Sequence, residues 1–85
     1  MKKILVAEDE QAIREFVVIN LRRAGYDTLE AGTGEEALEI YERENGSIDV
    51  ALLDIMMPGQ LDGLAVCRQL REKSGSIGII LLTAR

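Results

Sequence analysis

The 85-residue sequence has no histidine and only one cysteine, Cys67. Because a disulfide needs two cysteines and structural zinc sites use cysteine and histidine, neither feature is expected within this chain. The single thiol falls on the apolar side of a predicted helix, and we interpret it as a small buried hydrophobic residue. A chain of this length buries only about 60–68% of the surface of its unfolded form, so we expect one domain of marginal stability.

The sequence also lacks long apolar runs and clusters of basic residues. No stretch approaches the roughly 20 apolar residues that span a bilayer, and the first apolar run stops at acidic residues, too early for a signal peptide. The ten basic residues are scattered and the net charge is −5, whereas nucleic-acid binding needs a concentrated basic face. We therefore expect a cytoplasmic location, with neither a membrane nor a nucleic acid as partner.

What the sequence does have is a regular alternation of short apolar runs with helical periodicity. The predicted strands cover residues 3–7, 26–31, 50–54 and 78–82, and the predicted helices cover residues 12–24, 33–44 and 63–72. Strands that are apolar on both faces and separated by helices indicate a parallel sheet covered on both sides. The pattern predicts an α/β fold with right-handed crossovers and leaves the order of the strands open.

Local signals mark the ends of the helices and their buried faces. Thr33 with Glu36 forms a capping box, Asp62 can cap the third helix, and Asp9 or Glu10 can cap the first. Gly25 and the pair Asn45-Gly46 are the expected stops. The predicted buried residues are Ile13, Phe16, Val17, Leu21 and Ala24 in the first helix, Ala37, Leu38 and Tyr41 in the second, and Leu64, Cys67 and Leu70 or Arg71 in the third.

Acidic residues follow two of the strands at the point where each strand ends. Glu8 and Asp9 come after the first strand, and Asp54 ends the third. Since ligands of parallel sheets bind beyond the carboxyl ends of the strands, these carboxylates would meet if the two strands are neighbours. A hard cation such as Mg²⁺ relieves the repulsion between crowded carboxylates, and Asp54 beside it can attack a phosphoryl group. Thr83, which follows the fourth strand, could donate its hydroxyl to a phosphoryl oxygen.

The stretches KILVAEDE, GTGEEAL, LLDIMMPG, DGLAVCRQLR and LLTAR together resemble the receiver domain of bacterial two-component response regulators, over the whole chain. The resemblance implies a flavodoxin-like fold, with the strand order 2-1-3-4 in this chain. It also implies that residues 1–85 are the N-terminal part of a single receiver domain, lacking the family's fourth helix, fifth strand and fifth helix. The lysine and the switch aromatic that the family carries at its fifth strand have no counterpart here.

The same resemblance assigns roles to individual residues. Asp54 matches the aspartate that accepts a phosphoryl group from a partner histidine kinase in a Mg²⁺-dependent reaction. Asp9 matches the direct metal ligand, Glu8 the acid that holds the metal through water, and Met56 the residue whose backbone carbonyl binds the metal. Thr83 matches the switch hydroxyl. Such a domain is a signalling switch and not an enzyme. The segments GYDTLEA and LLTAR most resemble the corresponding segments of transcription factors with a winged-helix output domain.

The sequence also departs from the family pattern. Glu8 stands where aspartate is commoner, and PGQLDG is one residue longer than the usual PGMDG, so Gln60 or Leu61 lengthens the loop after Asp54. We expect kinase recognition to use Ile13, Arg14 and Phe16 together with the 57–61 loop. The alternative, that Ile13 and Phe16 are only core residues, stays open.

Other functions compete with the phosphoacceptor switch. One is a structural or interaction fragment without phosphorylation chemistry, which self-associates through the exposed fourth strand, 78–82. A flavin-binding protein is disfavoured because AEDEQ is acidic where a phosphate cradle rich in serine and threonine would be expected. A phosphatase with an aspartate nucleophile would carry an acid two residues after Asp54, where Met56 stands.

Overall fold

The computed structural model describes residues 2–82. Strands and helices alternate along this part of the chain, and each predicted element is present with ends within one residue of the prediction. Their order is β1 (Lys3–Ala7), α1 (Gln11–Arg23), β2 (Asp27–Ala31), α2 (Gly34–Arg43), β3 (Val50–Asp54), α3 (Gly63–Lys73) and β4 (Gly78–Leu82). No helix of the described residues is long and apolar enough to cross a membrane.

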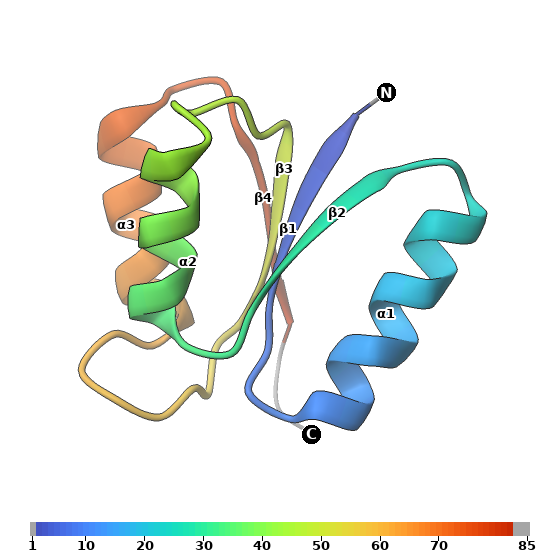
Figure 1. The fold of residues 1–85 in the computed structure, drawn as a ribbon. Helices are drawn as coiled ribbons and strands as arrows, with labels where there is room; N and C mark the ends of the chain where they lie inside the picture. Colours follow the sequence, from blue (N-terminus) through green and yellow to red (C-terminus); the bar gives the residue numbers. More distant parts are fainter. Residues whose placement is uncertain (1, 83–85) are drawn as a thin grey trace.

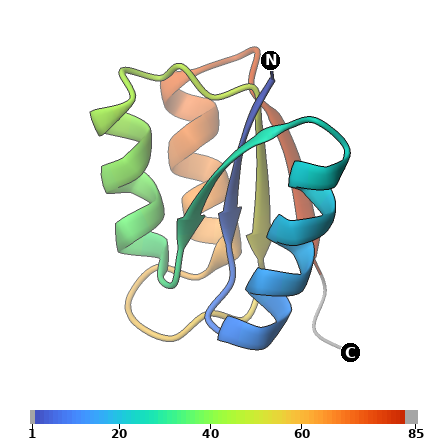
Figure 2. The same cartoon turned by 45° about the vertical axis from the view of Figure 1, so that its right-hand side comes forward.

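The strands form one parallel sheet in the order β2-β1-β3-β4, which confirms the predicted fold class and strand order. Helices α2 and α3 cover one face of the sheet and α1 covers the other (Figures 1 and 2). All strands point the same way, so the loops after β1 and β3 emerge side by side at one edge (Figure 2). Any site built from the residues that follow these strands lies at that edge.

The core is divided by the sheet into two parts. On the side of α2 and α3, the larger cluster contains the fully buried side chains of Leu5, Leu53, Val66 and Leu70. On the side of α1, the smaller cluster consists of Ile4, Val6 and Val18, with partly buried neighbours around it. Successive residues of β1 thus serve opposite cores, as the alternation of side chains along a strand requires.

The buried face of α1 agrees with the predicted stripe only in part, because Val17 and Leu21 are half-buried against the smaller core cluster and Ala24 is exposed. Val18 is the buried residue of this helix, whereas Ile13 is 39% exposed and Phe16 is 70% exposed. Apolar residues lie on more than one side of α1, and periodicity alone could not tell which side faces the sheet. The interpretation of Ile13 and Phe16 as core residues is therefore wrong for the described structure.

The buried face of α3 agrees with the prediction at Leu70 and differs at Leu64. Val66 and Leu70 are fully buried, while Leu64 is 44% exposed and Arg71 lies on the surface. Cys67 is half-buried and packs against the larger core cluster, so its interpretation as an apolar packing residue is confirmed in part. In α2 the predicted inward residues Ala37 and Tyr41 are buried, and Leu38 is half-buried.

Two of the predicted helix caps are confirmed and one is wrong. Thr33 accepts a hydrogen bond from the Glu36 amide (3.1 Å), and Asp62 accepts one from the Ala65 amide (2.9 Å). In the capping box, the Glu36 carboxylate accepts from the amide of Gly32 (2.7 Å), one residue before the cap. Glu10 begins α1 without any side-chain cap bond.

The expected helix stops have the required backbone conformation. Gly25, Asn45 and Gly46 have positive φ angles of 96°, 55° and 72°, which favour glycine and asparagine.

Candidate functional site

Three carboxylates meet at the carboxyl edge of the sheet, as the sequence predicted. Glu8 follows the last residue of β1, Asp9 comes next, and Asp54 is the last residue of β3. Because β1 and β3 are hydrogen-bonded neighbours, one carboxylate oxygen from each residue lies within 4.8 Å of the others. Glu8 and Asp54 are buried, with 5% and 7% exposure, and Asp9 is exposed to solvent. The cluster is thus open on one side.

Main-chain amides orient the two buried carboxylates. The Glu10 amide donates to Glu8 Oε2 (3.0 Å), and the Met56 amide donates to Asp54 Oδ1 (3.1 Å). Both bonds span two residues and bend the chain back over its own side chain at the strand end. Each carboxylate is therefore held by the turn that follows its own strand.

Burial and, to a smaller extent, charge crowding act on the Glu8 carboxyl. Burial raises the pKa of the Glu8 carboxyl above its ordinary value of 4.5, the hydrogen bond from the Glu10 amide lowers it in part, and the nearby Asp54 carboxylate raises it further. Burial without a cation therefore disfavours the charged form of Glu8.

The donor set fits a hard divalent cation. All three side chains offer carboxylate oxygens, which Mg²⁺ prefers over nitrogen or sulfur ligands. An added positive charge would offset both the burial of Glu8 and its repulsion by Asp54. The exposed Asp9 leaves the cluster accessible, so a bound ion could keep several waters, as Mg²⁺ usually does.

The remaining predicted site residues are placed only in part. Thr83 lies outside the described residues. The Met56 side chain points to solvent with 65% exposure, and its amide bonds to Asp54. The predicted role of the Met56 carbonyl as a metal ligand stays a prediction.

The longer loop after Asp54 is attached to the start of α2. The Gln60 amide donates to Glu35 Oε2 (3.2 Å), and Gly59, with a φ of 96°, lies close to the same carboxylate. Gly34 packs against Leu61 so closely that a Cβ atom there would collide with the Leu61 carbonyl oxygen. The extra residue is thus accommodated by a contact with α2.

Sequence reasoning missed two residues that shape this region. Glu35 was assigned only to the first turn of a helix, and Arg14 only to a surface that recognises a kinase. Arg14 Nη1 donates to the main-chain oxygen of Glu8 (2.7 Å), and its Nε pairs with Glu30 Oε1 (3.2 Å). A side chain that bonds to backbone leaves no spacing signal in the sequence, so neither contact could have been found there.

A parallel sheet in the order β2-β1-β3-β4 with acidic residues at its carboxyl edge defines a flavodoxin-like α/β domain with an acidic site. Residues 4–85 match the response regulator receiver domain family, and the chain belongs to that family. The assignment agrees with the resemblance seen in the sequence motifs.

Individual relatives support the same family. The chain is 46% identical to the alkaline phosphatase synthesis transcriptional regulatory protein PhoP of Bacillus subtilis, over 99% of this chain and 34% of the relative. It is 45% identical to the response regulator TrrA of Thermotoga maritima, crystallised in complex with Mg²⁺ and BeF, with a TM-score of 0.89, covering 100% of this chain and 71% of that one.

A second structure shows TrrA in complex with the histidine kinase ThkA. There the TM-score is 0.88 at 45% identity, covering 99% of this chain and 70% of the other. The chain spans about a third of the length of the curated relatives that it matches.

Proposed function

We propose that the chain is a phosphoacceptor switch in which Asp54 receives a phosphoryl group from a partner histidine kinase, with Mg²⁺ bound at the acidic cluster. The observation that carries this proposal is the cluster itself, in which oxygens of Glu8, Asp9 and Asp54 lie within 4.8 Å of one another. Crystallisation of the TrrA relative with Mg²⁺ and BeF, and with a histidine kinase, supports it.

In the proposed step a carboxylate oxygen of Asp54 attacks the phosphorus atom of a kinase phosphohistidine. A P–O bond forms as the P–N bond breaks, and the imidazole leaves with the electron pair and takes a proton from solvent. When bound, Mg²⁺ would neutralise charge on the phosphoryl oxygens. Asp54 is suited to this role because its carboxylate ends a central strand and is held by the Met56 amide (3.1 Å).

The proposed metal ligands are Asp9 and Asp54 directly, Glu8 through water, and the Met56 carbonyl. Thr83 is proposed as the switch hydroxyl. The chain is proposed not to be an enzyme, because Met56 stands where an aspartate-dependent phosphatase needs an acid.

The proposed kinase-docking surface combines α1 with the 57–61 loop. Phe16, at 70% exposure, and Ile13, at 39%, form an apolar patch on α1. Large exposed apolar side chains of this kind are typical of protein interfaces. Arg14, which was predicted to belong to this surface, uses its guanidinium to bond Glu8 and Glu30. We therefore assign the contact mainly to Ile13 and Phe16.

We further propose that residues 1–85 are the N-terminal part of a single receiver domain. The PhoP relative is named as a transcriptional regulatory protein. Transcription regulation is accordingly proposed for a protein that contains this chain.

A second candidate function is a structural fragment that self-associates without accepting phosphate. The exposed apolar residue Ile80 on β4, at 52% exposure, favours it. Incubation with acetyl phosphate, with MgCl₂ or with EDTA, separates the two functions by intact-mass measurement. A gain of one phosphoryl group that requires MgCl₂ supports the switch, and no gain under either condition supports the structural fragment.

A further inference from the structure

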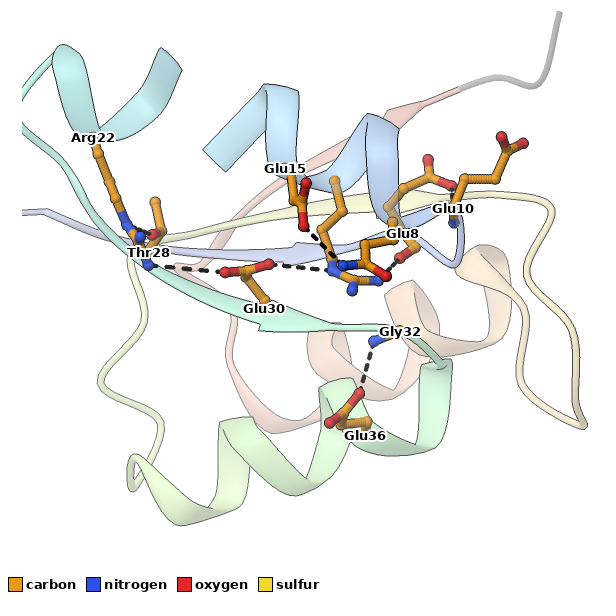
Figure 3. Close-up of polar contacts among 10 residues, drawn as sticks. Glu8, Glu10, Glu15, Arg22, Thr28, Glu30, Gly32 and Glu36 are labelled. Atoms are coloured by element: carbon orange, nitrogen blue, oxygen red, sulfur yellow. Dashed lines mark hydrogen bonds and ion pairs between the residues drawn. The ribbon is translucent and has the colours of Figure 1, made fainter. Parts of the chain in front are cut away.

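Arg14 ties three elements together beside the acidic cluster. It lies in α1, its Nη1 donates to the main-chain oxygen of Glu8 at the end of β1 (2.7 Å), and its Nε pairs with Glu30 on β2 (3.2 Å). The Arg14 side chain is 19% exposed and the Glu30 side chain 37% exposed. Figure 3 shows Glu30 on the strand that runs beside the corner containing Glu8 and Glu10.

The contact with Glu8 acts on the residue that follows. The Glu8 carbonyl belongs to the peptide unit that joins Glu8 to Asp9, and a peptide unit is planar. Holding its oxygen therefore restricts the orientation of the Asp9 backbone. The Glu8 amide is fixed by the Ala31 carbonyl (3.0 Å), and the Glu10 amide by the Glu8 carboxylate (3.0 Å). Asp9 thus stands between two anchored residues.

The guanidinium is itself anchored from the far side. Glu30 Oε1 accepts from Arg14 Nε (3.2 Å) and holds the far end of the guanidinium. Arg22 lies 3.9 Å from the other Glu30 oxygen, too far for a hydrogen bond, and its Nε bonds Thr28 Oγ1 instead (2.7 Å; Figure 3), so the anchor of Arg14 does not depend on Arg22. A planar fork can serve a carbonyl and a carboxylate in two directions at once, whereas a lysine ammonium is a single flexible point charge. The arrangement therefore depends on arginine and not only on a positive charge.

We propose that Arg14 is a positioning residue of the acidic cluster, which holds Asp9 in place for Mg²⁺ before the ion binds. The inference rests on the proposed function, because it concerns the same metal site. Without the ion, repulsion between the three carboxylates favours opening of the corner between β1 and α1. The bond from Arg14 to the Glu8 carbonyl opposes that opening.

The positive charge of Arg14 and its hydrogen bond to the Glu8 carbonyl have opposite expected effects on Mg²⁺ affinity. A cation beside the cluster weakens Mg²⁺ binding, whereas a fixed corner strengthens it. Arg14→Lys separates the two effects, since it keeps the charge and loses the fork. Loss of an outer-shell partner typically weakens metal binding about 10–100-fold, and we expect about tenfold here because water-rich Mg²⁺ sites use few protein ligands.

The test is a titration of the chain with MgCl₂, followed by calorimetry and by the NMR signal of the Asp9 amide. Arg14→Lys and Arg14→Ala are compared with Arg22→Ala, a matched control in the same network that has no bond to Glu8. Urea unfolding of each variant measures any general loss of stability. If Arg14→Ala does not fold, Glu30→Ala replaces it, since it removes the oxygen that accepts from Arg14 Nε and leaves Arg14 present; it should likewise weaken Mg²⁺ binding.

The expected result is weaker Mg²⁺ binding in both Arg14 variants and unchanged binding in Arg22→Ala. Wild-type affinity in Arg14→Lys, or an equal loss in Arg22→Ala, would overturn the inference while leaving the proposed function intact. If the unchanged chain binds no Mg²⁺ at all, both the proposed function and this inference fail.

Discussion

Glu8 is the residue at which folding and function conflict most directly. Its carboxyl is 5% exposed beside the carboxylates of Asp9 and Asp54, so the folded chain disfavours its charge. The conflict explains the direction of its pKa, which burial raises above 4.5. Buried and crowded carboxylates of this kind are typical of functional sites.

We predict that Glu8→Gln stabilises the metal-free fold at neutral pH. The pKa of Glu8 is higher in the folded state than in the unfolded state. The free energy of unfolding of the wild type therefore increases as the pH falls from the folded-state pKa to the unfolded-state pKa, and decreases as the pH rises through the same range. The advantage of Glu8→Gln should therefore be largest above the raised pKa and vanish below 4.5. Urea unfolding without Mg²⁺ at a series of pH values measures this. A variant less stable than the wild type at neutral pH would contradict it.

The meeting of the carboxylates was predictable from the sequence, and the contact of Arg14 with Glu8 was not. Glu8 and Asp54 stand at the ends of β1 and β3. Because these two strands are paired in parallel, the two carboxylates lie close together. Arg14 was predicted only as part of a kinase-recognition surface, because a bond to a main-chain oxygen depends on side-chain geometry.

Among the elements, α3 begins in close contact with the end of β3. Gly63 opens this helix, and its amide donates to the Ile55 carbonyl (3.2 Å). A Cβ atom at Gly63 would collide with the Asp54 carbonyl oxygen and lie 2.8 Å from the Ile55 Cα atom. The absence of a side chain there lets α3 begin directly against the end of β3.

Gly63→Ala is predicted to destabilise the fold by about 1–3 kcal/mol, the usual cost of overpacking. It should also weaken labelling of Asp54 by acetyl phosphate, since the end of β3 must move. Gly75→Ala is the matched control, because no atom lies within 4 Å of a Cβ built there. Equal urea midpoints for the Gly63 variant and the wild type would show that the contact is easily relaxed.

Helix α1 shows how far periodicity can predict an element. Its limits were predicted within one residue, but its buried face only in part. Val17 and Leu21 pack against the core as predicted, whereas Ile13 and Phe16 are exposed. A helix with apolar residues on two sides can place either one on the sheet, and only packing decides between them. The exposed side is what we assign to kinase docking.

Phe16→Ala should therefore slow phosphotransfer from the cognate histidine kinase and leave labelling by acetyl phosphate unchanged. Its effect on stability should stay within about 0.5 kcal/mol, as for most surface substitutions. Val18→Ala, with the wild-type residue 3% exposed, is the control that should lose stability. Unchanged phosphotransfer from the kinase, together with a large loss of stability, would show that Phe16 acts as a core residue and not in kinase docking.

At the scale of the whole molecule, β4 forms an apolar edge of the sheet. Within residues 2–82, β4 pairs only with β3, and Ile80 on β4 is 52% exposed. In the sheet register Ile80 lies opposite Leu52, which packs against the smaller core cluster on the α1 side of the sheet. An apolar edge strand with unpaired backbone groups favours pairing with another chain.

We predict that a polypeptide of these 85 residues alone self-associates through β4. The free energy of unfolding of a domain is only about 5–15 kcal/mol. Burial of apolar surface contributes about 25 cal/mol per Å², so pairing of β4 with another chain would add a sizeable part of that total. Sedimentation over a concentration series should show association that Ile80→Lys reduces. Leu64→Lys, at a 44% exposed position on α3, is the matched control and should leave it unchanged. A monomer that unfolds cooperatively at all concentrations would refute this prediction.

The most direct test of the central proposal is to label Asp54→Asn with acetyl phosphate in the presence of MgCl₂ and to measure the intact mass. The matched control is Asp27→Asn, at the start of β2 and hence at the opposite end of the sheet from the acidic cluster. We predict that the Asp27 variant gains one phosphoryl group like the wild type, and that the Asp54 variant gains none while keeping its urea midpoint. Equal labelling of the Asp54 variant would contradict the assignment of Asp54 as the phosphoacceptor.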